Sequence, residues 1–403
     1  MNNFQTDGDV RFLTHEIGSL AKPPWHVKTA AGRPLEESDL EHARSWGERL
    51  DVPGYDELVE LLRAPSEDGE ARRHDVARWS SRYAVRLLEA AGLDVVYDGE
   101  QQRSEMYAWA IDHANGFEPR GTVRSFDNKY YAKSAVTGPI SLAKPYHNEE
   151  FEFLQSVAEA RLKIPVTGAY TLAIWSYDEH YAPKQGRLGA PAGRRKEIEA
   201  RREFAMDLAR NLIRPNVEAL IELGADWIQI DEPGASTEPD ELEVFVESFN
   251  ASVEGLDCFF STHLCFSDYN LFFPAIEGMS GCSQYAVGFA NYDTRELGTS
   301  DADRPGYHVI RKFRDLAYRP ILGLGVLDIH TNFIEPPELV RDRILYAVDV
   351  FEDPGRIHVT PDCGLRTRSW EVAYEKLANM VAGTRMAEEA LNRAFAGARV
   401  LGS

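Results

Sequence analysis

EIEARREFAMDLARNLIRPNVEALIELG (197–224) and DWIQIDEP (226–233) follow one another in the middle of the chain. In the first segment apolar residues recur about every 3.6 positions, which predicts an amphipathic helix. The second is a short, nearly continuous apolar run, which is typical of a strand that is buried on both faces. Pro215 lies inside the helical segment and lacks a backbone N–H, so we expect a kink or a break there.

The same pair of patterns recurs along the chain. Seven further apolar runs end in small or polar residues, and together with 226–233 they are the predicted strands: 15–19, 93–100, 163–170, 258–265, 285–291, 321–328 and 356–364. Helical patterns at 81–92 and 336–355 lead into two of them. Buried strands that alternate with helices indicate a parallel sheet. Eight such strands predict the α/β class and a closed (β/α)8 TIM barrel, for which roughly 250 residues suffice.

The remaining residues fall into two segments. Residues 20–80 are polar and charged, and we expect them to form a helical or loop extension outside the barrel. Residues 101–162 contain turn residues and short β-prone pieces, which predict a β-hairpin excursion after the second strand. Because no linker separates these segments from the strands, we expect residues 1–403 to form one barrel catalytic domain.

Charge and composition exclude several classes of protein. The 403 residues contain 65 acidic and 44 basic side chains, a formal net charge of −21, which disfavours nucleic-acid binding through phosphate contacts. No apolar run reaches the roughly 18 residues of a membrane-spanning helix, and the first residues show no apolar signal-peptide segment. Four cysteines in a chain of this length do not form a disulfide scaffold, so we expect reduced thiols, as in cytoplasmic proteins. We therefore expect a cytoplasmic protein with small-molecule ligands and neither nucleic-acid nor membrane partners.

The predicted strands end in residues that can do chemistry. In a (β/α)8 barrel the active site lies at the carboxyl ends of the strands. The polar residues at these ends are Ser19, Asp98, Glu100, Thr167, Tyr170, Asp231, Glu232, His263, Cys265, Asn291, Asp293, Asp328, His330, Asp362 and Cys363. Loop residues are often polar, and this explains about half of the set. It explains poorly the two histidines and two cysteines.

His263 and Cys265 are two residues apart at the end of the fifth run, so in a strand both side chains face one side. Cys363 ends the eighth run, which approaches the others if the barrel closes. Imidazole and thiolate groups are the ligands that zinc prefers, and a catalytic zinc site keeps one position open. The alternative is that the cysteines are small buried hydrophobes, an interpretation that fits Cys258 and Cys282 better.

Four further side chains have two interpretations each. Asp231 and its neighbour Glu232 point to opposite faces of a strand, so one of them enters the site as an ammonium ligand or base, or else caps a helix. His330 is a general acid or a loop histidine that binds backbone. Trp175 flanks a ligand or packs in the core.

Seven motifs occur in the order seen in one known family: HEIGS, YDGEQQRSEM, TGAYTLAIWSYDEHY, ADWIQIDEPGAS, STHLC, LGVLDIHT and VTPDCGLRTR. From about residue 13 to about residue 385 the chain resembles the catalytic C-terminal barrel of the cobalamin-independent methionine synthase family. The long two-barrel members carry an additional N-terminal half, so this chain is similar to the short, single-barrel members.

The resemblance implies a zinc-dependent methyltransferase of methionine biosynthesis, in which a zinc-bound thiolate of homocysteine accepts a methyl group. It implies that zinc is held by His263, Cys265 and Cys363. The amino-acid ends of the substrate would be held by Ile17, Ser19, Glu100 and Asp231. His330 would protonate the departing donor, and Trp175 would flank the donor pocket. Elementary chemistry agrees, because zinc deprotonates a thiol whose pKa is about 8.5, and an amine donor leaves poorly unless protonated.

Two departures from the family leave the donor open. The family places a zinc-binding glutamate at the end of the sixth strand, where this chain reads VGFANYDTREL and puts Ala290 or Asn291. The zinc would then have three protein ligands and a water, or Asp293 as a substitute ligand. The folate-side Arg-Pro-Pro segment reads RSFDNKYYAKSAVTG (124–138).

The alkyl donor is therefore methylfolate or another compound. The first alternative is alkylation of a thiol with a non-folate donor or an epoxide, as in coenzyme M transferases, or specialised-metabolite chemistry on the same barrel. The second is a non-catalytic barrel that binds an amino acid or a folate.

Overall fold

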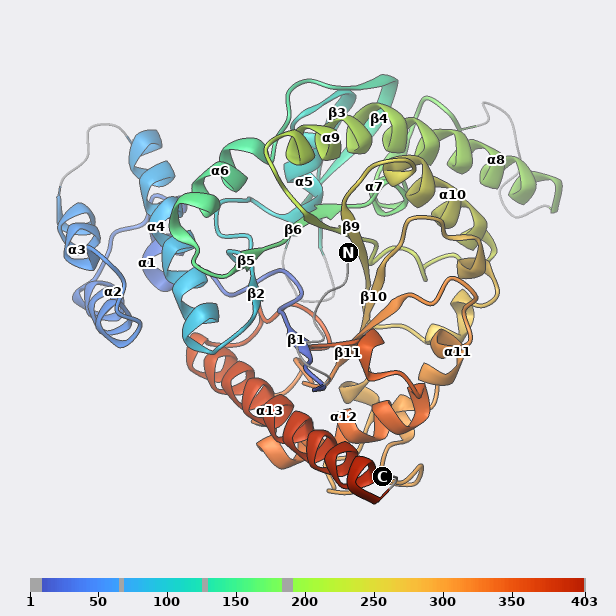
Figure 1. Ribbon diagram of the computed structural model, residues 1–403. Coiled ribbons are helices and arrows are strands. Elements are labelled where there is room, and N and C mark those ends of the chain that lie inside the picture. Colours follow the sequence, from blue (N-terminus) through green and yellow to red (C-terminus); the bar gives the residue numbers. More distant parts are fainter. Residues whose placement is uncertain (1–8, 65–68, 125–129, 183–190, 402–403) are drawn as a thin grey trace.

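The fold is a ring of short parallel strands surrounded by helices (Figure 1). The computed structural model describes residues 9–64, 69–124, 130–182 and 191–401. Seven strands form one sheet in the order β1-β12-β11-β10-β9-β8-β6, and every neighbouring pair is parallel. These strands are β1 (Leu13–Thr14), β6 (Ile164–Thr167), β8 (Trp227–Asp231), β9 (Phe259–Leu264), β10 (Gln284–Val287), β11 (Ile321–Gly325) and β12 (Ile357–Thr360).

Strand β2 (Val95–Val96) closes the ring between β1 and β6. It pairs with β5 (Arg161–Leu162), which directly precedes β6, and a parallel bridge joins His15 to Val95 on the other side. The backbone N–H of Lys163 also donates to the Val96 carbonyl at 3.1 Å. The predicted (β/α)8 barrel is therefore confirmed. The first strand differs in position, because β1 ends at Thr14 and the predicted 15–19 follows it as the connection toward the site.

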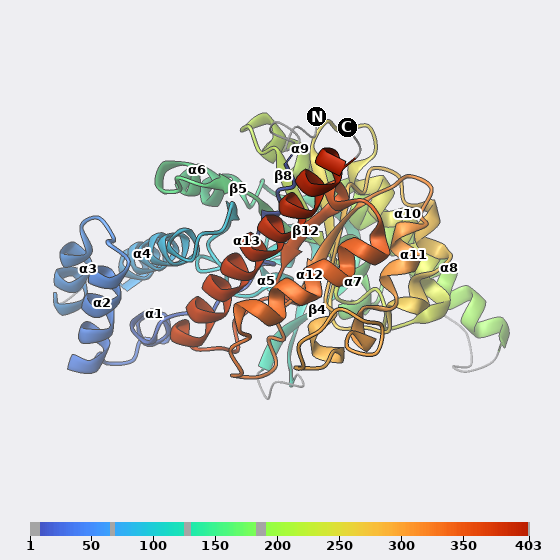
Figure 2. The same ribbon diagram turned by 60° about the horizontal axis from the view of Figure 1, so that its bottom comes forward.

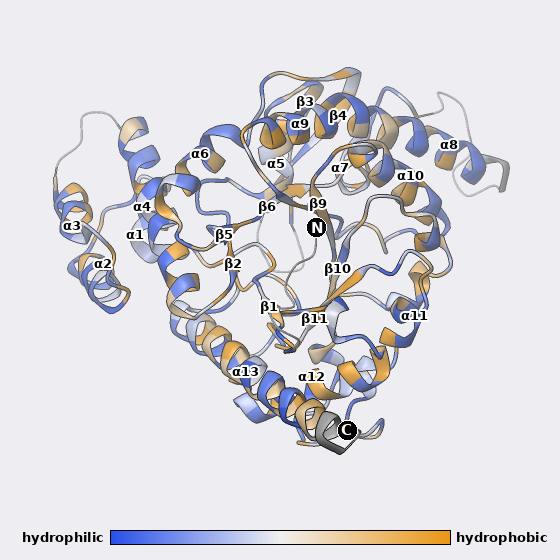
Figure 3. Ribbon diagram, in the orientation of Figure 1, coloured by the Kyte–Doolittle hydropathy of each residue, from blue (hydrophilic) through white to orange (hydrophobic). Residues whose placement is uncertain are grey.

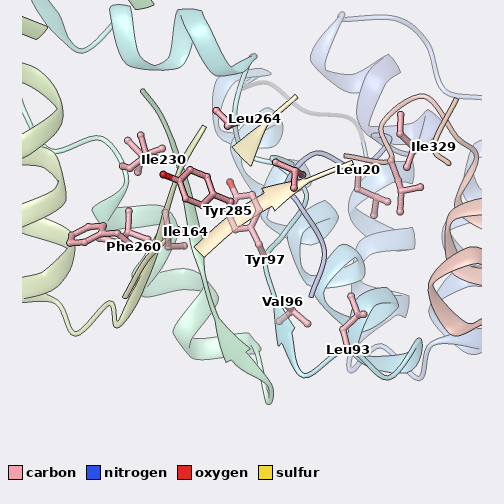
Figure 4. Close-up of a cluster of buried hydrophobic side chains, with 14 of the residues drawn as sticks. Leu20, Leu93, Val96, Tyr97, Ile164, Ile230, Phe260, Leu264, Tyr285 and Ile329 are labelled. Carbon is pink, nitrogen blue, oxygen red and sulfur yellow. The ribbon is translucent and has the colours of Figure 1, made fainter. Parts of the chain in front are cut away.

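The strands are buried because both of their faces are covered. All residues of β6, β8, β10, β11 and β12 are buried, as the apolar runs predicted. Figure 4 shows side chains from several strands, among them Ile164, Ile230, Phe260 and Tyr285, in one hydrophobic cluster. Burial of this kind stabilises the fold by about 25 cal/mol per Å² of apolar surface.

Helices of the outer layer include α4 (Gly69–Ala90), α6 (Asn148–Val157), α7 (Ala169–Trp175), α8 (Pro191–Leu208), α9 (Arg214–Glu222), α10 (Leu242–Val253), α11 (Ile310–Arg314), α12 (Pro337–Phe351) and α13 (Trp370–Leu401). Figure 2 shows α12 and α13 side by side, and the two helices contact each other. Hydrophilic and hydrophobic turns alternate along α10 and α13 in Figure 3, as in helices with one face on the barrel.

The predicted interruption near Pro215 takes the form of a π-helical turn. Ala209–Ile213 lies between α8 and α9 and directly precedes the first turn of α9, which contains Pro215. Proline has no N–H to donate to the carbonyl four residues earlier, and a π-helical turn is one way to absorb the missing bond.

Both predicted insertions are present. The N-terminal extension forms α1 (Pro24–Ala30), α2 (Glu37–Arg49), α3 (Tyr55–Arg63) and the first part of α4, on the side of the barrel opposite α8 (Figure 1). The excursion after β2 contains α5 (Met106–Ile111) and an antiparallel hairpin of β3 (Ala114–Arg124) and β4 (Tyr130–Leu142), to which β7 (Tyr177–Asp178) adds. Residues 65–68 and 125–129 of the two predicted segments lie outside the described residues.

Within the described ranges, no helix is both long enough and apolar enough to cross a membrane.

Candidate metal and substrate site

The carboxyl ends of β9 and β12, which β10 and β11 separate in the sheet, bring together the sulfur and imidazole side chains. His263 is the last but one residue of β9, and Cys265 directly follows that strand. Cys363 lies three residues beyond β12. Because parallel strands end at one rim, residues 100 positions apart in the chain become neighbours. The predicted meeting of the fifth and eighth runs is therefore found in the structure.

The three side chains form a compact group, which we call the sulfur cluster (His263, Cys265 and Cys363). The Cys363 Sγ lies 3.2 Å from the Cys265 Sγ and 3.3 Å from the His263 Nε2. The ligand atoms of all three residues lie within 4.8 Å of one another. The other ring nitrogen of His263, Nδ1, lies 2.9 Å from the Ala286 carbonyl on β10, and this contact directs Nε2 at the sulfurs. One nitrogen and two sulfurs at these separations suit zinc.

The members of the sulfur cluster perturb one another's protonation. The hydrogen bond with Cys265, together with burial, raises the pKa of the Cys363 thiol well above its usual value. The same hydrogen bond lowers the pKa of Cys265. Burial alone would lower the pKa of His263, but Cys363 and Asp231 outweigh it and leave that pKa raised. Thiolates and neutral imidazole bind metals, so a cation at this position would displace these protons.

Asp293 does not join the sulfur cluster, so its predicted role as a substitute ligand is wrong. Its carboxylate is fully buried and pairs with Arg304 at 2.6 Å and Arg343 at 3.1 Å. A buried carboxylate with two arginine partners is held in place by them and is not available to a metal.

The position that corresponds to the family's zinc-binding glutamate, at the end of the sixth predicted strand, differs from the prediction. Strand β10 ends at Val287, so Gly288 stands at its end, whereas Ala290 and Asn291 lie beyond it in a 3₁₀ turn. A Cβ on Gly288 would approach the Asp362 Cβ to 2.9 Å, so a larger residue does not fit without a shift. The prediction that Ala290 or Asn291 occupies the ligand position is wrong because the strand is shorter than its apolar pattern.

The carboxylate of Asp362 fills the space beside Gly288. It accepts hydrogen bonds from the backbone N–H groups of Phe289 and Ala290, both at 3.0 Å, and of Asn291 at 2.7 Å. Burial raises the pKa of Asp362 to about 7, although these hydrogen bonds oppose the rise. Both oxygens are used within the fold, so the cluster of possible ligands keeps three members among the described residues.

Ile17 and Ser19 lie next to the sulfur cluster. A small cavity is lined by both residues and by Cys363 and Gly364. A Cβ on Gly364 would come within 2.9 Å of the Ser19 backbone nitrogen, so only glycine permits this approach. The Ile17 carbonyl accepts from Gln229 Nε2 at 2.6 Å and from Lys163 Nζ at 3.0 Å, which fixes the loop after β1.

Two of the predicted carboxylates, Asp231 and Glu100, interact electrostatically. Asp231 ends β8 and pairs in register with His263 of β9. Burial raises the pKa of Asp231 to about 6, and the charge of Glu100 adds to the rise while His263 opposes it. Glu100 is half-buried and has a left-handed backbone, with a φ of 63°. The carboxylate of Glu232, by contrast, is fixed by Thr171, whose N–H and hydroxyl donate to it, so the structural interpretation applies to this residue.

His330 and Trp175 lie farther from the sulfur cluster. His330 is exposed after β11, and its ring stands edge-on to Phe266, the residue after Cys265, with centroids 4.9 Å apart. Trp175 ends α7 half-buried and packs against the hydrophobic core. Among the described residues, the structure gives no contact between Trp175 and the sulfur cluster.

Sequence analysis missed a group of buried polar residues below the rim, which we call the lysine cluster (Glu16, Lys163 and Gln229). Lys163 is fully buried and donates to the Gln229 Oε1 at 2.7 Å and to the carbonyls of Glu16 and Ile17. Gln229 in turn donates to Asp231 at 2.7 Å. The only signal in the sequence was a polar residue beside or inside an apolar strand, as in KIPV and WIQI.

The chain matches a known protein family along most of its length. Residues 59–386 match the family model described as the cobalamin-independent synthase, catalytic domain. The chain belongs to the cobalamin-independent methionine synthase family. It is therefore a methyltransferase, and the family and enzyme class expected from the seven motifs are confirmed.

Methionine synthases from two archaea are among the similar proteins. The protein from Thermoplasma volcanium is 36% identical over 330 residues, which cover 78% of this chain and 90% of the relative. The protein from Thermoplasma acidophilum is 35% identical over 385 residues, which cover 92% and 96%. Both relatives match along nearly their whole length.

Solved structures of the family share the fold. A B12-independent methionine synthase from Shewanella sp. W3-18-1, in complex with selenomethionine, superposes with a TM-score of 0.69 at 22% identity. The superposition covers 94% of this chain and 99% of the other. A putative vitamin-B12 independent methionine synthase from Listeria monocytogenes has a TM-score of 0.59 at 17% identity and covers 94% and 98%.

Proposed function

We propose that this methyltransferase makes methionine by moving a methyl group onto the thiol of homocysteine, with the reaction centred on the sulfur cluster. The observation that carries the proposal is the meeting of one imidazole and two thiols within 4.8 Å at the carboxyl rim of the barrel. A small cavity bordered by Cys363, Ile17 and Ser19 adjoins this group, so Ile17 and Ser19 lie within reach of a substrate bound there.

The donor set fits a catalytic zinc ion. His263, Cys265 and Cys363 would hold it, and three protein ligands leave one position for substrate. Zinc bound there would lower the pKa of the substrate thiol, so that the sulfur is a thiolate at neutral pH. The contact of His263 with the Ala286 carbonyl is the outer interaction that orients a zinc-binding histidine.

The neighbouring residues would hold the two ends of the amino acid. Asp231 and Glu100 offer negative charge to the ammonium group, and Gln229 keeps the Asp231 carboxylate in place through its 2.7 Å hydrogen bond. Ile17 and Ser19 line the adjoining cavity and would position the carboxylate end. Fixing both ends aims the thiol at the donor, which lowers the entropic part of the barrier.

His330 would supply the proton that the leaving donor needs. Its ring is exposed at the rim and lies against Phe266, directly after Cys265. A positioned imidazolium can donate a proton to a departing amine. Trp175 would flank the donor from the end of α7, as the resemblance implies.

The donor is tested by an assay of methionine formation. Purified protein, reconstituted with zinc, is supplied with homocysteine and either methyltetrahydrofolate, its polyglutamylated form or methylcobalamin. We expect methionine from at least one of these, and none from Cys363→Ser. The matched control is Cys258→Ser, which replaces a half-buried thiol outside the sulfur cluster. Alkylation of coenzyme M by an epoxide, without methionine from any methyl donor, would contradict the proposal.

The chemistry also indicates a reducing compartment. Two thiols 3.2 Å apart would be oxidised readily outside one, and an oxidised pair no longer offers thiolates. We therefore assign the protein to the cytoplasm.

A further inference from the structure

A second cavity, of about 570 Å³, lies outside the methyl-transfer site. It is bounded by α1, the N-terminal half of α4, the loop after β2, α5 and the start of α6. Figure 1 shows α4 between α1 and α6, and it contacts both helices. The volume falls within the range of pockets that hold small molecules. The methyl-transfer mechanism uses none of the residues that line it.

The lining carries more positive than negative charge. Lys22, Arg73 and Arg78 border the cavity and form no ion pair with any residue that the structure describes. Two other cations of the lining are paired: Arg103 with Glu150 at 2.8 Å, and Lys144 with Glu149 at 3.6 Å. Glu70 is the one further carboxylate in the lining. On a chain with a net charge of −21, such a local surplus selects for anions, which the rest of the surface repels.

One wall of the cavity is aromatic. The rings of Trp109 and His113 have centroids 5.2 Å apart, and those of His113 and Tyr146 stack at 5.4 Å with planes 22° apart. Trp109 Nε1 and Tyr146 Oη are buried and have no hydrogen-bond partner in the described part of the chain. Both groups can donate a hydrogen bond, so this wall favours a planar ligand that carries acceptor atoms.

We propose that this cavity binds a small molecule with a planar portion and at least two negative charges, such as phosphates or carboxylates. The cations would neutralise the charges and the aromatic wall would cover the plane. The proposal goes beyond the methyl transfer and stands without it. One residue of its lining, Gln101, directly follows Glu100 of the proposed substrate site in the chain. The ligand is thus either a separate effector or the anionic end of the methyl donor.

Calorimetry at low salt tests the proposal on the full chain. The probes are adenosine diphosphate for plane plus charge, pyrophosphate for charge alone and adenosine for the plane alone. We expect adenosine diphosphate to bind most tightly and its affinity to fall with added salt. Arg73→Ala/Arg78→Ala, which removes two cations from exposed and half-buried positions of α4, should weaken binding at least tenfold.

The matched control is Arg195→Ala/Arg393→Ala, which removes two exposed cations elsewhere and should change the affinity less than twofold. No saturable binding of either anionic probe, or an equal loss in both double variants, would overturn the proposal. The source of the ligand follows from the methyl-transfer assay. A raised KM for the donor in Arg73→Ala/Arg78→Ala identifies the donor's anionic end, and an unchanged KM identifies a separate ligand.

Discussion

Two polar clusters occupy adjacent levels of the same barrel, and their hydrogen bonding differs. In the lysine cluster, Lys163 is fully buried and its ammonium has acceptors on Glu16, Ile17 and Gln229. In the sulfur cluster, the two thiols contact each other, and Cys363 also contacts His263. A buried polar group whose bonds are all made within the fold serves the fold. The two sulfur atoms and the His263 Nε2 of the sulfur cluster contact one another at the carboxyl rim of the barrel. Such a group is suited to bind a metal ion from solution.

The lysine cluster is linked to the proposed substrate site through one side chain. Gln229 accepts from Lys163 at 2.7 Å and donates to Asp231 at 2.7 Å. The accepted bond fixes which way the Gln229 amide points, and therefore which atom faces Asp231. The lysine cluster thus positions a carboxylate of the proposed substrate site. Substitutions in the sulfur cluster should therefore lower activity, whereas substitutions in the lysine cluster should lower the free energy of unfolding.

The largest effect on activity is expected from Cys265→Ser. A change in a residue that only orients a metal ligand typically lowers activity roughly 10–100-fold. Because Cys265→Ser removes one of the three ligands themselves, the loss of methyl transfer should be larger. The free energy of unfolding of the metal-free protein should change by less than about 1 kcal/mol, because Cys265 is only partly buried. Activity assays and urea unfolding measure the two quantities. A Cys265→Ser protein that unfolds early would show that the sulfur cluster is structural.

His330→Gln should lower kcat by about 10²–10⁴, the usual contribution of a general acid. The bound zinc and the KM for homocysteine should not change, since His330 lies at the exposed rim. Steady-state kinetics and metal analysis check this expectation. His308→Gln is the control, because this histidine is also exposed and lies in a different loop. Equal losses in both variants would remove the assigned role.

Lys163→Met should destabilise the fold by about 3–5 kcal/mol, because it leaves the buried Glu16 carboxylate without its cation and the Gln229 Oε1 without its donor. Urea unfolding measures the change, and Lys196→Met, on the exposed surface of α8, should stay within about 0.5 kcal/mol. If Lys163 also positions Asp231, the KM for homocysteine rises under native conditions while the zinc content stays constant. An unchanged free energy of unfolding in Lys163→Met would show that the lysine cluster does not stabilise the fold.

A pH dependence should separate Asp231 from the sulfur cluster. Burial raises the pKa of Asp231 to about 6, so this carboxylate is ionised above that pH and protonated below it. Binding of methionine to the metal-free protein should therefore weaken about tenfold per pH unit as the pH falls below 6. Calorimetric titrations from pH 5 to 8 measure this dependence. In Asp231→Asn, binding should be weak and independent of pH over this range.

Most of the barrel could be predicted because each strand is a local pattern. The apolar runs from 93–100 to 356–364 contain the observed barrel strands, except that β10 begins one residue before its run, since a strand covered on both faces must be apolar almost throughout. The pair of His263 and Cys265 could also be predicted, because residues two apart in a strand share a side. Their approach to Cys363 follows once the ring is closed.

The errors arose where local patterns do not determine contacts. Val287 ends β10 although apolar residues continue beyond it, so the equivalent of the missing glutamate was placed too late in the chain. Asp293 has a suitable functional group, but two distant arginines neutralise it. Lys163 and Gln229 gave only a weak signal, because the partners of a buried polar residue come from other strands. The expectation that residues 1–403 form one domain stays a prediction.

The proposed function requires the sulfur cluster to hold a catalytic metal. The most direct test is the zinc content of the purified protein beside Cys363→Ser, with Cys258→Ser as the control, after identical reconstitution and without chelator. We predict about one zinc per chain in the wild type and in Cys258→Ser, and a sharp loss in Cys363→Ser. A wild-type chain that retains no zinc after reconstitution, or a Cys363→Ser chain that retains it fully, would contradict the account.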